Sequence, residues 1–285
     1  MSELNVKFGE NQRSIPAPAS VADALKAFDR DLFKKSIAAK LNGEEVDLNK
    51  QLSATDEVLL IEPILPETRD GLEVIRHSTA HLLAAAVLDL FPGTKLGVGP
   101  ALMEDARYGY YYDIIAPRQL TIEDLPVIEK RMKAIAKQNL PYRREDISKS
   151  QILDIFEERD EPLKKELIAE KVTDTASIYY IDNSPFIDFC LGPHVPHTGK
   201  LKAFKLLALS GAYWKGDASN AQMQRIYGTA FATQEELDGW TRQREEAEKR
   251  DHRRIGKELD LFSINDDYGQ GLIFWHPKGG IMRME

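Results

Sequence analysis

The chain has 285 residues, of which 42% are hydrophobic and 29% are charged, and its formal net charge is −8. These values are typical of a globular chain long enough for two or three domains, and the negative charge excludes a uniformly basic nucleic-acid surface. The single cysteine, Cys190, excludes an internal disulfide. We expect a cytoplasmic protein, because neither a signal peptide nor a membrane-spanning run is visible.

Residues 1–66 predict a small α+β domain of the β-grasp type. Residues 4–8 alternate like a strand and lead into a turn, and Ser20 is a good N-cap for the helix that follows. Residues 36–43 and 57–63 predict further strands. The order of hairpin, helix and later strands favours the ubiquitin-like arrangement.

Residues 67–232 predict a second α+β domain, with a curved antiparallel sheet and a central helix. The central helix is expected to begin at the N-cap Asp70, with Glu73 completing a capping box, and to end before a Pro-Gly pair. A second helix is expected over 121–139 with Thr121 as its cap, and a third is expected to break near Pro162.

The last part of the chain has a different composition. Residues 233–262 alternate acidic and basic side chains, which predicts a long charged linker helix. Residues 263–285 bring a fresh apolar strand and a Gly-Gly turn just before the end, and we expect them to begin a further domain that is cut short.

Two short stretches carry the chemistry. RHSTAH places His77 and His81 four residues apart, so that they share one face of a helix. CLGPH places Cys190 and His194 four residues apart in a loop, because its Gly-Pro pair breaks a helix. Together the stretches use three of the six histidines and the only cysteine.

Three interpretations of these stretches remain open. The histidines and Cys190 could be buried structural groups, which is the ordinary meaning of two histidines four residues apart. They could form a Cys-His-His-His zinc site, although the spacing is unusual for a closed structural site. They could also form a hydrolytic pocket, because an imidazole can hold a water molecule and accept its proton. The two stretches taken together favour a site over structural histidines.

Longer stretches of the sequence carry a family resemblance. The segments GLEVIRHSTAHLLAAAV, FIDFCLGPHVPHTGKLKAFKLLALSGAYWKGD and QRIYGTAF resemble the N-terminal half of bacterial threonyl-tRNA synthetases. The resemblance implies a TGS domain over 1–66, an editing domain over 67–232, a linker helix over 233–262 and a truncated class II catalytic domain from 263. The implied activity of this part is hydrolysis of mischarged seryl-tRNA(Thr), since one missing methyl group gives too little discrimination by binding alone.

The resemblance also implies roles for individual residues. His77 and Lys164 match the positions that act on the attacking water, and we expect them to be catalytic. His81, Asp188, Cys190 and His194 match positions that line the pocket and bind substrate, with Asp188 holding the substrate amino group. Judged without the family, Lys164 reads as part of a solvated helix face and Asp188 as a solvent-facing residue of a hairpin.

Partners and cofactors follow from the same resemblance. The expected partner is tRNA(Thr), with no membrane, and a homodimer is expected only for the full-length enzyme. Editing is expected to need no cofactor, whereas ATP, Mg and Zn belong to the full-length ligase, with sites beyond residue 285. The alternatives are a zinc-dependent alanyl-tRNA editing deacylase, in which His77, His81, Cys190 and His194 hold the metal, and a non-catalytic tRNA-binding module.

Overall fold

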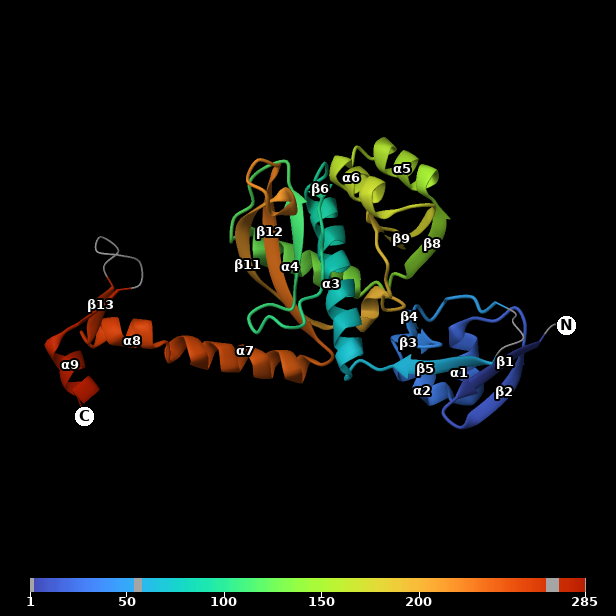
Figure 1. Cartoon of the computed structure of the whole chain (residues 1–285), viewed down its shortest axis with the longest axis horizontal. Coiled ribbons are helices and arrows are strands. Elements are labelled where there is room, and N and C mark those ends of the chain that lie inside the picture. The colour runs from blue at the N-terminus through green and yellow to red at the C-terminus, as the bar shows by residue number, and fades with distance from the viewer. Residues whose placement is uncertain (1–2, 54–57, 265–271, 285) are drawn as a thin grey trace. The chain divides into compact units, whose positions relative to one another are not determined.

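The computed structural model describes residues 3–53, 58–264 and 272–284. Glu57, the first residue of a predicted strand, and residues 265–271 and 285 of the predicted last domain lie outside these ranges. The described chain mixes helices with several sheets and divides into two compact units, Met1–Gln234 and Glu235–Glu285 (Figure 1). The prediction of an α+β chain is confirmed. None of the helices in the described part has both the length and the apolar character needed to cross a bilayer.

The larger unit begins with a five-stranded mixed sheet of strand order β2-β1-β5-β3-β4. Its elements are β1 (Glu3–Phe8), β2 (Asn11–Pro16), α1 (Val21–Phe28), α2 (Arg30–Lys35), β3 (Ala38–Leu41), β4 (Glu44–Val46) and β5 (Leu59–Ile64). β1 pairs antiparallel with β2 and parallel with β5, whereas β3 pairs antiparallel with both β4 and β5. Ser20 caps α1 as predicted, in a reciprocal capping box with Asp23.

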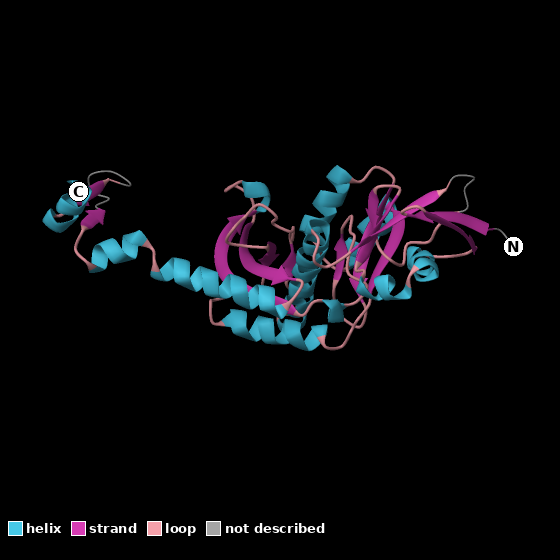
Figure 2. Cartoon of the chain, turned by 90° about the horizontal axis from the view of Figure 1, so that it is seen from below, coloured by secondary structure: helices cyan, strands magenta, loops and turns pink. Residues whose placement is uncertain are grey.

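A four-stranded antiparallel sheet of order β11-β12-β7-β6 follows, and Figure 2 shows its curvature. This part comprises α3 (Arg69–Leu90), β6 (Lys95–Leu96), β7 (Tyr110–Ile115), α4 (Asp124–Ala136), a 3-10 turn (Thr198–Lys200), β11 (Ala203–Tyr213), a second 3-10 turn (Trp214–Gly216) and β12 (Gln222–Phe231). The central helix α3 packs against β7, β12 and α4. It is therefore buried on nearly every side, from Gly71 to Val87.

A three-stranded antiparallel sheet of order β10-β9-β8 completes the larger unit (Figure 1). Its elements are β8 (Tyr142–Ser148), α5 (Lys149–Glu158), α6 (Pro162–Lys171), β9 (Thr175–Ile181) and β10 (Ile187–Phe189). Helices α5 and α6 pack on this sheet, and the predicted break at Pro162 is confirmed because Pro162 begins α6. The predicted hairpin that leads into CLGPH is also present, as β9 and β10.

Two predicted helix starts are wrong. The cap of α3 is Thr68, whose hydroxyl accepts from the Gly71 N–H at 3.0 Å, and Asp70 instead pairs with Lys40 at 2.6 Å. A carboxylate that neutralises a lysine of β3 is less available as a cap. Helix α4 begins at Asp124 rather than next to Thr121, because the Asp124 carboxylate turns back to accept from the Thr121 N–H.

The smaller unit contains α7 (Gln234–Lys249), α8 (His252–Glu258), a two-stranded ribbon of β13 (Phe262–Ile264) and β14 (Ile273–Trp275), and α9 (Pro277–Met284). The single long helix predicted for 233–262 is wrong, because Asp251 leaves the helical conformation and caps a new helix, α8. Within α7 and α8 the charges form pairs four residues apart, such as Arg244 with Glu248 at 3.3 Å.

Candidate hydrolytic site

The structure brings the two histidine-bearing stretches together. His77 and His81 lie one turn apart on α3, and Cys190 and His194 lie in the loop after β10. The ligand atoms of the four side chains all lie within 4.8 Å of one another. The Cys190 Sγ is 3.2 Å from His77 Nε2 and 3.5 Å from His194 Nε2. We call these four residues the His-Cys cluster.

The shape of the loop depends on Gly192. Its φ is +72°, and a Cβ at this position would lie 2.0 Å from the Tyr179 hydroxyl oxygen. Only glycine satisfies both the left-handed conformation and the close approach. The Gly192 N–H also donates to the Cys190 Sγ at 3.3 Å, which holds the thiol facing the cluster.

A buried ion pair lies beside the cluster. Lys164 on α6 pairs with Asp188 on β10, and each residue is only 2% exposed. The Tyr112 hydroxyl donates to the second Asp188 oxygen, which lies 3.7 Å from His81 Nε2. Local sequence alone predicts that Lys164 and Asp188 face solvent. This prediction is wrong, because tertiary packing buries both side chains. Tyr112 had no distinguishing signal among the tyrosines of its strand.

Burial sets the protonation states of the cluster. It lowers the pKa of His77 to about 4, and the positive charge of Lys164 adds to this effect. Burial also lowers the pKa of His81 and His194 well below the usual value, helped by the neighbouring imidazoles. The pKa of Cys190 is raised to about 12, again because of burial. At neutral pH the cluster holds three neutral imidazoles and a thiol, a set that can accept a proton but lacks a thiolate nucleophile.

A carboxylate from the first sheet supports the loop. Asp47, which directly follows β4, accepts from the His194 backbone N–H at 2.8 Å and from the Tyr179 hydroxyl at 2.6 Å. It is 6% exposed, and burial raises its pKa. Sequence reasoning missed Asp47, since a single acidic residue after a short strand has no distinguishing pattern.

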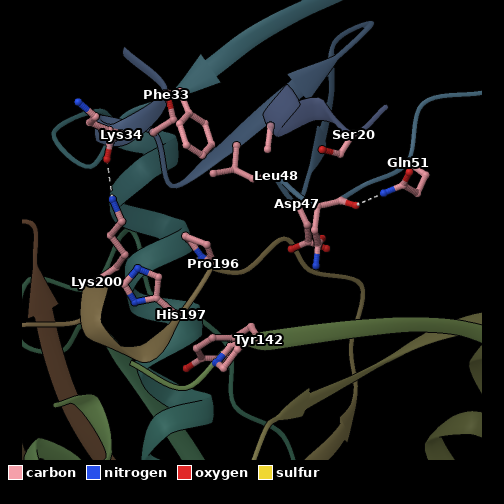
Figure 3. Close-up of a pocket in the computed structure, with 14 residues that line it drawn as sticks. Ser20, Phe33, Lys34, Asp47, Leu48, Gln51, Tyr142, Pro196, His197 and Lys200 are labelled. Atoms are coloured by element: carbon pink, nitrogen blue, oxygen red, sulfur yellow. Dashed lines mark hydrogen bonds between the residues drawn. The ribbon is translucent and has the colours of Figure 1, made fainter. Parts of the chain in front are cut away.

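Asp47 also lines a cavity of about 540 Å³ (Figure 3). The figure shows Asp47 and Leu48 on one side and Tyr142, Pro196 and His197 on the other. Tyr142 stacks on His194, with ring centroids 5.2 Å apart. Two of the side chains that hold His194 in place are therefore also walls of this cavity.

Comparison with known proteins gives related sequences along nearly the whole chain. It is 43% identical over 284 residues to a threonine–tRNA ligase of Geobacter sp. (strain M21), covering 99% of this chain and 43% of that protein. It is 44% identical over 272 residues to the ligase of Geobacillus kaustophilus, covering 95% and 40%, and 45% identical over 284 residues to that of Acidithiobacillus ferrooxidans, covering 99% and 42%. Residues 176–227 match the family model described as the threonyl and alanyl tRNA synthetase second additional domain.

Over nearly its whole length, this chain is similar to part of the threonine–tRNA ligases. It spans roughly two fifths of the length of these relatives, with 43% and 40% of two of them covered. The segment matched by the family model contains Asp188, Cys190 and His194, whereas His77, His81 and Lys164 lie outside it. The family match and the geometry thus overlap at the loop that closes the cluster.

We expect Asp47→Ala to loosen this loop. The change leaves the His194 N–H and the Tyr179 hydroxyl without their acceptor in a buried place. Each orphaned group costs about 1–3 kcal/mol, so urea denaturation should show a lower free energy of unfolding, and any hydrolytic activity should fall with it. The control is Asp31→Ala, since Asp31 has an 84% exposed side chain. A stability equal to that of the control would contradict the supporting role.

Tyr110 and His276 have structural roles. Tyr110 is fully buried and is unable to reach a nucleotide in solvent. His276 has partners that the sequence did not reveal: its Nδ1 lies 2.7 Å from Asp260 and its Nε2 lies 3.0 Å from Ser263. The order of groups is that of a serine-histidine-aspartate triad, but the Asp260 side chain is 68% exposed. We therefore interpret these contacts as structural, because they join the end of β14 to β13 and to the turn before it.

Proposed function

We propose that this chain is the proofreading part of a threonine–tRNA ligase and hydrolyses seryl-tRNA(Thr). The observation that carries the proposal is the His-Cys cluster, with the half-buried His77 beside the buried Lys164–Asp188 pair. An ester of serine with the terminal ribose would enter this pocket. The proposal includes a TGS domain over 1–66, an editing domain over 67–232, a linker over 233–262 and the start of a catalytic domain over 263–285.

The proposed reaction is an ordinary ester hydrolysis. Water attacks the seryl carbonyl carbon, and His77 accepts a water proton while Lys164 helps to orient that water. The bond from the carbonyl carbon to the ribose oxygen then breaks, and the ribose oxygen takes up a proton. The products are free serine and uncharged tRNA(Thr), and no oxidant, reductant or other co-reactant is consumed.

The remaining residues are proposed to bind and orient the substrate. Asp188 would hold the seryl amino group, since it pairs with Lys164, accepts from the Tyr112 hydroxyl and carries the negative charge that an ammonium group needs. His81 and His194 line the pocket, and Cys190 shapes it as a protonated thiol. Rejection of threonine then depends on one methyl group, a difference of about 1–3 kcal/mol in a close-fitting site.

Substrates and cofactors of the longer protein are part of the proposal. The partner is tRNA(Thr), editing needs no cofactor, and ATP, Mg and Zn serve aminoacylation at sites beyond residue 285. Dimerisation is proposed for the full-length ligase.

A metal-dependent deacylase is the second candidate, favoured by one observation. The spacings of 3.2 and 3.5 Å from Cys190 Sγ to two imidazole nitrogens suit a tetrahedral zinc site, whose sulfur-to-nitrogen edge is about 3.5 Å. His77, His81, Cys190 and His194 would then hold the ion. Bound zinc would supply a more acidic water, and Lys164 and Asp188 would keep their roles in binding and orientation.

The deciding experiment uses two charged tRNAs. The purified chain is mixed with seryl-tRNA(Thr) or threonyl-tRNA(Thr), with and without prior chelation, and amino acid release is followed together with the metal content. We expect serine to be released selectively at a rate that chelation leaves unchanged. Loss of activity together with metal supports the zinc deacylase, and failure to release serine from either preparation refutes the proposed function in favour of a non-catalytic tRNA-binding module.

A further inference from the structure

Ser78 lies on α3 next to the first cluster histidine and is fully buried, with 0% exposure. Its hydroxyl oxygen accepts from the Val195 backbone N–H at 3.0 Å and lies 3.1 Å from His194 Nδ1. Its carbonyl oxygen accepts from the Tyr142 hydroxyl at 2.7 Å. Ser78 is therefore held at both its backbone and its side chain, between the helix and the loop.

The hydrogen-bonding capacity of serine decides where its proton lies. A hydroxyl has one hydrogen to donate and two lone pairs that accept. Val195 occupies one lone pair, and among the residues that the structure describes the hydroxyl has no other bonded acceptor than His194 Nδ1. A buried hydroxyl without an acceptor is unfavourable, so the Ser78 O–H donates to Nδ1. A neutral imidazole carries one hydrogen, and that hydrogen must then be on Nε2.

We propose that Ser78 is a positioning residue that keeps His194 in the Nε2–H tautomer, so that His194 donates a hydrogen bond in the site and does not accept a proton there. The Nε2 faces the cluster, 3.5 Å from the Cys190 Sγ. The ring has little freedom to turn, because Tyr142 stacks on it with an interplanar angle of 13°. Asp47 holds the backbone of the same residue at 2.8 Å.

This assignment gives His194 and His77 different roles in catalysis, and it rests on the proposed hydrolysis. His194 would direct its N–H at the oxygen on which negative charge develops when water attacks the ester. In the described part of the structure the Ser78 hydroxyl bonds to His194 and not to His77, so His77 remains the group that accepts the water proton. The ring centroids of the two histidines lie 4.5 Å apart, close enough for both side chains to contact the same bound ester.

The tautomer is measured directly by long-range ¹H–¹⁵N correlation of the histidine rings at neutral pH. We expect the wild-type His194 to show a protonated Nε2 and an unprotonated Nδ1, and Ser78→Ala to show a mixture of the two forms. In seryl-tRNA(Thr) deacylation, Ser78→Ala should lower kcat about 10- to 100-fold with KM little changed. Ser78→Thr keeps the hydroxyl and should restore much of the loss in both measurements.

The matched control is Thr79→Val. Thr79 is the next residue on α3 and is equally buried, and its hydroxyl donates to the Ile75 carbonyl of its own helix at 2.7 Å. We expect its His194 spectrum and its kcat to match the wild type. A protonated Nδ1 in the wild-type His194 would overturn the inference, and so would equal kcat values for Ser78→Ala and Thr79→Val. If the wild type releases no serine, the proposed function fails, and the ring spectra of the wild type and the variants decide the tautomer without any activity.

Discussion

Replacing His77 with alanine is expected to lower the rate of seryl-tRNA(Thr) deacylation by about 10²- to 10⁴-fold, the usual contribution of a positioned proton acceptor. The reason is the neutral state of His77, whose pKa is lowered to about 4 by burial and by the charge of Lys164. Serine release from purified wild-type and variant chains, measured in single-turnover reactions, gives the ratio. The control is His252→Ala, since the side chain of His252 is 83% exposed.

The pH profile provides a second check on His77. A pKa of about 4 means that the imidazole is uncharged from pH 6 to 8, so its protonation should not alter the enzymatic rate in that range. As the pH falls towards 4 the imidazole gains a proton and loses its ability to accept one, and the rate should fall. Full deacylation by His77→Ala, or a rate that falls with a midpoint near pH 6.5, would contradict the assigned role.

Replacing Lys164 with methionine is expected to lower the free energy of unfolding by about 3–5 kcal/mol, because it leaves a buried carboxylate without its counter-charge. Both Lys164 and Asp188 are 2% exposed, so water has little access to compensate the loss. Urea denaturation followed by circular dichroism measures the change. Deacylation should also be lost, since the same variant removes the cation that orients the attacking water in the proposed reaction.

Two further variants separate the charge from the packing. Lys165→Met changes the neighbouring lysine, whose side chain is 36% exposed, and should alter the stability by less than about 1 kcal/mol. The double variant Lys164→Met with Asp188→Leu removes both charges and should recover much of the lost stability while remaining inactive. A Lys164→Met chain as stable as the Lys165→Met chain would show that the buried pair does not hold the two elements together.

Local rules account for much of what was correct in the sequence predictions. Ser20 caps α1 because an N-cap bond joins residues three apart, and Pro162 starts α6 because its ring is incompatible with a helix interior. The spacing of His77 and His81 places them on one face of α3 for the same kind of reason. The errors at Asp70 and Thr121 arose where several polar residues compete for one helix start, and neighbours from another element or the next turn decided between them.

The sequence, through its local structural preferences, thus determined the α+β class and the main helices and strands. It also showed the two stretches that carry the imidazoles and the thiol. The tertiary structure alone decided which distant groups surround them. Asp47 and His194 are 147 positions apart in the sequence and share a hydrogen bond, and Lys164 lies in a charged helix yet is buried beside Asp188. The physical reason is that helix propensities and caps act over a few residues, whereas burial and the pairing of buried charges depend on how whole elements pack.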